Sequence, residues 1–219
     1  MAKAPYIEEG RLRHLLKAAG ISGESPLRNV ALLTTVYGTG MMLTEIARMP
    51  VRAYLNGDGS VRVKSCVDAA IAYNGKERPI YWSNAKVTNA MDAYLAYRTD
   101  QRQGTTPMAT AFRGLDPDGP LFSTGEGQPY KLIERRTRSG TPSYSCDSLS
   151  QLFRKLHLQA GIEGASAMSG RRTFAVRLAN NGFDLRHINE LLGHETLTAT
   201  KRLIDADPVR LGAIVARVI

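Results

Sequence analysis

The hydrophobic pattern of this chain changes its period early and then changes back. Apolar residues recur at helical spacing over residues 8–48 and again from residue 84 onward. Between these stretches, residues 56–59 (Asn-Gly-Asp-Gly) and 74–75 (Asn-Gly) have the composition of tight hairpin turns. The pattern predicts a mainly α-helical (α+β) fold with a small antiparallel β-sheet inserted near the start.

Each expected helix is an apolar stripe bounded by capping residues, glycine or proline. The expected helices cover residues 8–19, 25–37, 43–48, 84–99, 147–161, 171–181, 185–192 and 207–218. The expected strands are 51–55 paired with 60–64, and 69–73 paired with 78–82. Residues 104–146 are rich in Gly, Pro, Ser and Thr and are expected to form a long loop. We expect one domain over residues 1–219, helical over 8–48, with the sheet insert at 51–82 and helical again over 84–219.

Charge and composition exclude several classes of protein. The formal net charge of +9 predicts attraction to polyanions, although charge alone carries no information about the fold. The sequence lacks an apolar run of about 18 residues, which excludes a transmembrane helix, and its first residues lack the apolar core of a secretory signal. Two cysteines, Cys66 and Cys146, make neither a disulfide framework nor a four-ligand metal site. We expect a cytoplasmic protein that uses no metal and no cofactor.

Three sequence motifs share one chain order with a known family. The first is residues 37–46, which contain Thr-Gly and then an acidic residue. The second is residues 74–78 (Asn-Gly-Lys-Glu-Arg), and the third is residues 171–175 (Arg-Arg-Thr-Phe-Ala) followed by residues 191–194 (Leu-Leu-Gly-His). Together they resemble the T-G-x-R-x-x-E-L, K-G-x-K-x-R and H-x-x-R-[HR]-T-F-A … L-L-G-H motifs of tyrosine recombinases (phage integrases). The third motif is specific, and the resemblance extends from about residue 8 to residue 207.

The resemblance implies a catalytic-domain fold and a particular chemistry. In the family, a tyrosine oxygen attacks a DNA phosphodiester and forms a 3′-phosphotyrosyl link without metal. Cationic groups stabilise the charge that develops on the phosphate, and an acid protonates the leaving oxygen. The resemblance also implies that the separate N-terminal core-binding domain of the family is absent here.

Only two of the six family roles fall on suitable residues. Arg171 occupies the position of the second arginine, and His194 occupies that of the later histidine. The positions of the first arginine, the hairpin lysine, the first histidine and the nucleophile fall on Met42, Tyr73, Met168 and Leu203. All nine tyrosines lie between Tyr6 and Tyr144, so none can occupy the C-terminal position of the nucleophile. We therefore predict a degenerate member of the family without strand-cleavage activity.

The cationic residues of the motifs are expected to bind duplex DNA through its phosphates. The expected contacts are Arg171, Arg172, His194, Lys76 and Arg78. Other roles remain open for each group. Arg171 and His194 could be structural, Lys76 and Arg78 could be solvated, and Met42 and Met168 could fill the core.

Three functions remain open. The first is a DNA-binding regulator, architectural factor or partner of an active recombinase. The second is an active recombinase with relocated catalytic residues, for which Tyr73 is the candidate nucleophile. The third is a protein-interaction module that no longer binds DNA. The apolar face of residues 211–218 would serve self-association or a heteromer with an active recombinase, as C-terminal segments do in the family.

Overall fold

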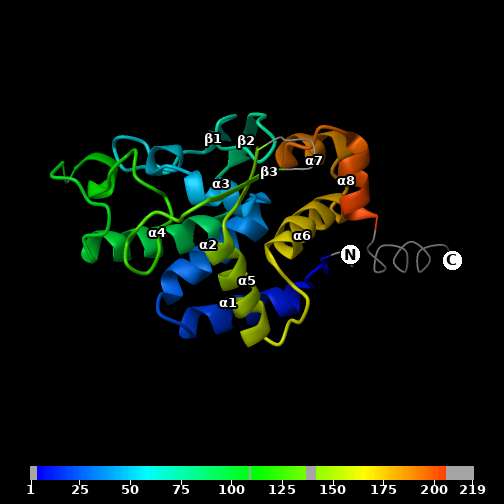
Figure 1. Cartoon of the computed structure of the whole chain (residues 1–219), viewed down its shortest axis with the longest axis horizontal. Helices are drawn as coiled ribbons and strands as arrows, with labels where there is room; N and C mark the ends of the chain where they lie inside the picture. Colours follow the sequence, from blue (N-terminus) through cyan, green and yellow to red (C-terminus); the bar gives the residue numbers. More distant parts are fainter. Residues whose placement is uncertain (1–3, 109, 137–141, 206–219) are drawn as a thin grey trace.

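The computed structural model describes residues 4–108, 110–136 and 142–205, and within them the chain is mainly helical (Figure 1). The helices are α1 (Glu9–Ile21), α2 (Pro26–Thr39), α3 (Leu43–Arg48), α4 (Ala85–Asp100), α5 (Asp147–Gln159), α6 (Ala167–Asn180), α7 (Leu185–Leu192) and α8 (Leu197–Ile204). Two separate antiparallel sheets contain β1 (Lys64–Val67) with β2 (Arg78–Tyr81), and β3 (Ile133–Arg136) with β4 (Pro142–Ser145). The predicted class, mainly α with small antiparallel sheet structure, is confirmed.

Helix α2 lies at the centre of the main core. It packs against α1, α4 and α6, so apolar residues on most of its surface are buried. Leu32, Leu33 and Val36 are each fully inaccessible to solvent. The helix is therefore interior over most of its length, and its buried polar residues, such as Thr34 and Thr39, donate their hydroxyls to main-chain carbonyls of the same helix.

Helix α2 ends at Gly40, where the chain must turn sharply and also approach α6 closely. Gly40 has φ +66°, and its N–H donates to the Val36 carbonyl. A Cβ atom at this position would lie 2.8 Å from the ring of Phe174 on α6. Glycine therefore satisfies both the left-handed backbone and the close packing that places the α2–α3 turn against α6.

The last three helices share a smaller core of their own. Its buried members are Ala175 of α6, Ile188 and Leu192 of α7, and Ile204 of α8. The side chain of Asp184 caps α7 by accepting a hydrogen bond from the Arg186 N–H, as its position before the apolar stripe predicts. Figure 1 shows α7 beside the β1–β2 sheet and α8 on the other side of α7.

Several predicted helix boundaries were wrong. Gly38, expected to interrupt the second helix, lies within α2 because its missing side chain makes room for Val87 of α4. Helix α6 begins at Ala167 rather than Arg171, since Ser166 and Ser169 form a capping box. Helix α8 was not predicted. The helix expected over 207–218 lies outside the described residues.

The predicted hairpins were also wrong in detail. Residues 51–53 form a short 3-10 turn, and Leu55 pairs with Val61 in an isolated bridge only. Strand β2 pairs with β1, not with residues 69–73, which form turns. Strand pairing across a ten-residue connection is not visible in a local turn pattern, which explains the error.

The segment expected to be one long loop, residues 104–146, contains more structure. It holds a 3-10 turn, η2 (Ala111–Gly114), and the β3–β4 pair. All four residues of β3 are exposed, so its sequence lacks the apolar alternation that marks a half-buried strand.

Candidate functional site

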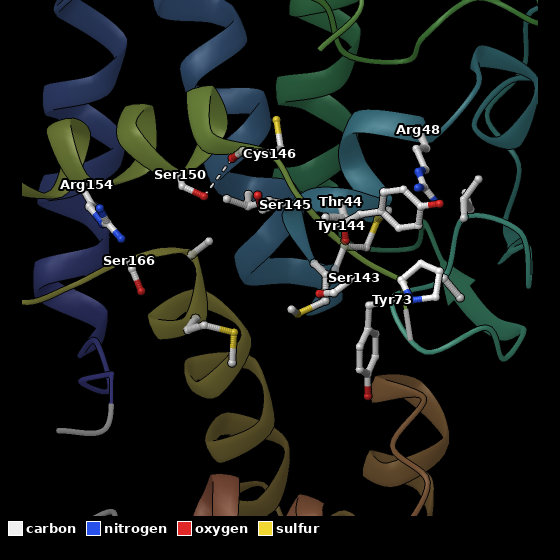
Figure 2. A pocket seen from close by; sticks show the side chains of 18 residues that line it. Thr44, Arg48, Tyr73, Ser143, Tyr144, Ser145, Cys146, Ser150, Arg154 and Ser166 are labelled. Atoms are coloured by element: carbon white, nitrogen blue, oxygen red, sulfur yellow. Dashed lines mark hydrogen bonds between the residues drawn. The ribbon is translucent and has the colours of Figure 1, made fainter. Parts of the chain in front are cut away.

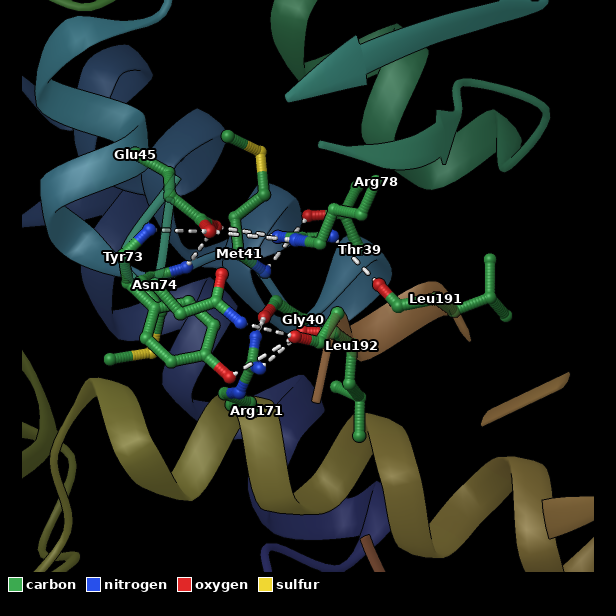
Figure 3. A network of polar contacts seen from close by, with 12 residues as sticks. Thr39, Gly40, Met41, Glu45, Tyr73, Asn74, Arg78, Arg171, Leu191 and Leu192 are labelled. Carbon is green, nitrogen blue, oxygen red and sulfur yellow. Dashed lines mark hydrogen bonds and ion pairs between the residues drawn. The ribbon is translucent and has the colours of Figure 1, made fainter. Parts of the chain in front are cut away.

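Arg171 projects from α6 into the junction of three segments and is only 2% exposed. Its two terminal nitrogens donate to the carbonyl oxygens of Gly40 and Leu192, each at 2.5 Å (Figure 3). Burial, and then the nearby charge of Arg78, lower the pKa of Arg171 to about 10, so it remains charged at neutral pH. The guanidinium group thus joins α6 to the ends of α2 and α7.

Tyr73 covers the guanidinium group of Arg171. The Cζ atom of Arg171 lies 5.1 Å from the centroid of the Tyr73 ring, within the range of a cation–π contact. The Tyr73 hydroxyl lies 3.4 Å from the Gly193 carbonyl, which also accepts a 2.8 Å bond from the Asn74 side chain. Burial raises the pKa of Tyr73, so its phenol is protonated at neutral pH.

Arg78 forms an ion pair with Glu45 in the interior. Nη2 of Arg78 lies 2.5 Å from Oε2 of Glu45, and the two side chains are 2% and 0% exposed. Arg78 also donates to the Leu191 carbonyl at 2.7 Å, and Glu45 accepts the Met42 N–H at 2.9 Å. The sequence led us to expect Arg78 on a DNA-facing surface. The structure places it inside instead, because a buried carboxylate holds it there.

His194 follows the glycine that ends α7 and contacts α8. Its Nδ1 lies 2.8 Å from the Thr200 hydroxyl, and that hydroxyl accepts a 3.0 Å bond from the Asn189 amide. Thr200 thus orients the imidazole ring of His194 through Nδ1, and Nε2 is the ring nitrogen on the other side. Burial and the charges of Arg171 and Arg78 lower the pKa of His194 to about 4.

The remaining expected DNA contacts differ in exposure. Lys76 is exposed on the turn before β2. Arg172 is 5% exposed and donates to the Ala4 carbonyl at 2.7 Å, which attaches the N-terminal segment to α6. We expected Arg172 to lie at the surface, and the structure buries it. Lys76 alone of these two presents its charge to solvent.

The residues that the sequence resemblance placed at the other four family positions differ in their surroundings. Met42 is partly buried at the start of α3, and Leu203 packs from α8 against the small C-terminal core. Met168 is 40% exposed on the first turn of α6, so the alternative that it fills the core is wrong.

Two cavities open beside these residues. Met42, Tyr73 and Met168 line one of about 380 Å³ between α3, β4, α5 and α6 (Figure 2). His194, Leu203 and Met168 line a second one of about 830 Å³. Met168 borders both, so the two cavities are neighbours.

Sequence reasoning did not assign roles to Glu45, Asn74 or Thr200. Glu45 belongs to the first motif, and its place three residues after the N-cap of a short helix was a usable signal. Asn74 lies in the middle motif and Thr200 in α8, and neither has a comparable signal in the sequence.

Among the described residues, no group of three or more His, Cys, Asp or Glu side chains can hold a metal ion. No helix in the described ranges is long and apolar enough to cross a bilayer.

Sequence comparison finds similarity along nearly the whole chain. The model of the phage integrase family matches residues 5–208. The chain is 30% identical over 198 residues to tyrosine recombinase XerC of Halalkalibacterium halodurans, covering 90% of this chain and 56% of that protein. It is also 30% identical over 177 residues to XerC of Pelobacter propionicus, covering 80% and 47%. The chain thus spans about half the length of these curated relatives.

Comparison with solved structures supports the fold. The crystal structure of XerA recombinase matches with a TM-score of 0.71 and 19% identity, over 99% of this chain and 66% of that one. The Tn1549 transposon integrase in complex with transposon right end DNA matches with a TM-score of 0.66 and 15% identity, over 100% of this chain and 67% of that one. The catalytic domain of bacteriophage HP1 integrase matches with a TM-score of 0.57 and 16% identity, over 99% of this chain and 96% of that one. The architecture of this chain is therefore that of a tyrosine recombinase catalytic domain.

Proposed function

Because this chain belongs to the phage integrase family, we propose that it binds duplex DNA and does not cleave it. In this proposal it acts as a regulator, an architectural factor or a partner of an active recombinase. Any subunit contact would use the apolar residues of 211–218, and the protein would act in the cytoplasm.

The observation that carries the proposal is the arrangement around Arg171. Its guanidinium nitrogens bind main-chain carbonyls, and Tyr73 stands over it where the family has a lysine. Leu203 offers no hydroxyl for attack on phosphorus. A missing arginine in phosphoryl transfer costs about 10³–10⁵ in rate, and a missing acid or base roughly 10²–10⁴.

We assign the DNA contacts by exposure and by hydrogen-bonding capacity. Lys76 offers an exposed ammonium group, and His194, held at Nδ1 by Thr200, donates to a phosphate oxygen when Nε2 carries the ring hydrogen. Arg171 reaches phosphate only if Tyr73 moves aside. Arg78 and Arg172 keep their protein acceptors and act by holding the surface in place.

A suicide DNA substrate with a nick next to the cleavage site tests for cleavage. The protein is incubated with it and separated on a denaturing gel, with an active tyrosine recombinase as positive control. We expect no covalent adduct. A protein–DNA adduct that survives denaturation, and that disappears after protease treatment, overturns the proposal.

One observation favours the rival function of an active recombinase. Tyr73 is the tyrosine that contacts Arg171, so it is the candidate for a relocated nucleophile. Under this rival, an adduct forms and disappears in a Tyr73→Phe variant. An adduct that persists in this variant assigns the nucleophile elsewhere.

DNA binding itself is measured separately, by fluorescence anisotropy with random duplex at several salt concentrations. Affinity is expected to fall steeply with salt, because each phosphate contact releases counterions. Lys76→Gln should lower the slope of log K against log [salt] by about 1, whereas the matched Lys17→Gln variant on α1 should leave it unchanged. No binding at low salt would favour the protein-interaction module instead.

A further inference from the structure

We propose that the 380 Å³ cavity between α3, β4, α5 and α6 binds a single nucleotide, with its base among the apolar and aromatic residues and its phosphate on Arg154. The nucleotide is either a free mononucleotide or an extrahelical nucleotide of bound DNA. The proposal does not depend on loss of cleavage activity. Binding of a free mononucleotide does not depend on DNA binding either.

The size and walls of the cavity suit a base and a sugar. A volume of about 380 Å³ falls within the range of small-molecule sites. Tyr73 and Tyr144 supply aromatic surface, and Met42 and Met168 supply polarizable apolar surface. Bases stack on aromatic side chains with little dependence on sequence, which makes this wall a suitable platform.

The charge of the cavity favours an anion. Among the described residues that line it, Arg48 and Arg154 are the ionised groups, and no carboxylate is present. Figure 2 shows the two arginines at opposite ends of the cavity. Arg48 already donates to the Ala70 carbonyl and stacks on the Tyr144 ring at 4.3 Å.

Arg154 is the cation that remains available. It is exposed, and no hydrogen bond or ion pair to it occurs within the described part of the chain. A guanidinium group can contact two phosphate oxygens at once. The hydroxyl of Ser166, which also lines the cavity, lies beside Arg154 in Figure 2 and offers a further donor.

The replaced family residues explain why such a cavity exists here. Three of the four positions that lack the family residue, Met42, Tyr73 and Met168, line this one cavity. Where the resemblance places arginine, lysine and histidine, the chain has side chains that pack against a flat apolar group. The anion-binding role is thereby moved to Arg154 at the edge of the cavity.

The first experiment titrates the protein with dAMP in a calorimeter, with adenosine and inorganic phosphate as separate probes. We expect saturable binding of one dAMP, at least about tenfold tighter than either probe. Arg154→Gln should weaken dAMP binding about tenfold and leave adenosine unaffected. The matched Lys155→Gln variant, with the same change of charge at the next residue, should bind dAMP like the wild type.

The second experiment distinguishes the source of the nucleotide. A duplex with one 2-aminopurine opposite an abasic site is titrated with protein, and a rise in fluorescence reports an unstacked base. The variant Met168→Glu places a carboxylate in the cavity wall at an exposed position. If the fluorescence rise is lost in this variant, the site is assigned to a nucleotide of DNA. A response to dAMP alone assigns it to a free nucleotide.

The proposal is overturned if the protein neither binds dAMP in the calorimeter nor raises the fluorescence of the 2-aminopurine duplex. It is also overturned if inorganic phosphate binds as tightly as dAMP, or if Lys155→Gln weakens binding as much as Arg154→Gln. Circular dichroism of each variant verifies that it is folded.

Discussion

The ring of Tyr73 lies over the guanidinium group of Arg171, 5.1 Å from ring centroid to Cζ. A neutral aromatic side chain is compatible with a cation that is almost fully buried, whereas a second cation at the same position would repel it. Residue 73 therefore contributes to the environment in which Arg171 stays charged in the interior, together with the nearby carboxylate of Glu45.

Replacing Tyr73 with lysine, the residue of the family motif, should destabilise the free protein by about 1–2 kcal/mol. The cation–π contact is lost, and a like charge is added beside Arg171. Urea denaturation measures the effect, which should shrink at high salt. Tyr73→Phe is the control, because it removes the hydroxyl and its 3.4 Å contact with Gly193 but keeps the aromatic ring over Arg171. A Tyr73→Lys variant as stable as Tyr73→Phe contradicts this account.

Removal of Glu45 should be far more costly than removal of an exposed charge. Glu45→Ala leaves the buried Arg78 without its carboxylate and is expected to cost about 3–5 kcal/mol. Lys86→Ala breaks an exposed 3.4 Å pair with Glu9 and should cost less than about 1 kcal/mol. If Glu45→Ala does not fold, the double variant Glu45→Leu/Arg78→Met should recover stability, since it removes both buried charges. Equal costs for the two single variants would refute the role of the buried pair.

Stability should fall as the pH drops from about 6.5 toward 4. The pKa of His194 is lowered to about 4 in the folded state, so the unfolded state takes up the proton first. His157, buried and bonded to Tyr37 at 2.8 Å, has a lowered pKa for the same main reason, burial, and adds to the effect. Each group contributes at most about 1.4 kcal/mol per pH unit. His194→Gln should flatten the profile between pH 5 and 6.5, as measured by urea denaturation, and an unchanged profile would contradict the assignment.

Restoring the nucleophile alone should not restore cleavage. Leu203→Tyr adds a phenol at the border of the cavity that holds His194, but Met42 and Met168 carry neither charge nor a dissociable proton, and burial raises the pKa of the Tyr73 phenol, which makes it a weaker acid. On a suicide substrate we expect no adduct from this single variant. The fourfold variant with Met42→Arg, Tyr73→Lys and Met168→His is expected to form one. Adduct formation by Leu203→Tyr alone would show that the remaining residues suffice.

The parts of the fold that the sequence predicts are those governed by local signals. Asp184 and Gly193 bound α7 as expected, and Ser25-Pro26 marks the start of α2. Strand β1 was missed because its partner lies beyond an intervening turn, and β3 because all its residues are exposed. Helix α8 was also missed; it is eight residues long, and only one of its two buried residues, Ile204, is apolar.

The candidate site divides in the same way. The motifs identify the positions of Arg171 and His194, because motif spacing is a property of the sequence. They do not reveal that Arg78, at the start of strand β2, is buried, since its partner Glu45 is 33 residues away on helix α3. Whether an arginine faces solvent depends on partners that are distant in the sequence. The position of the arginine in a motif does not identify those partners.

The small core shared by α6, α7 and α8 has a consequence for local unfolding. Ile188, Leu192 and Ile204 are buried there, apart from the main core. Local openings follow such boundaries, so the amide hydrogens of α7 and α8 should exchange with solvent deuterium sooner than those of α2. Opening this unit would break the bonds from Arg171, Arg78 and Asn74 to the carbonyls of residues 191–193 together, and the two arginine side chains would become accessible in a single step.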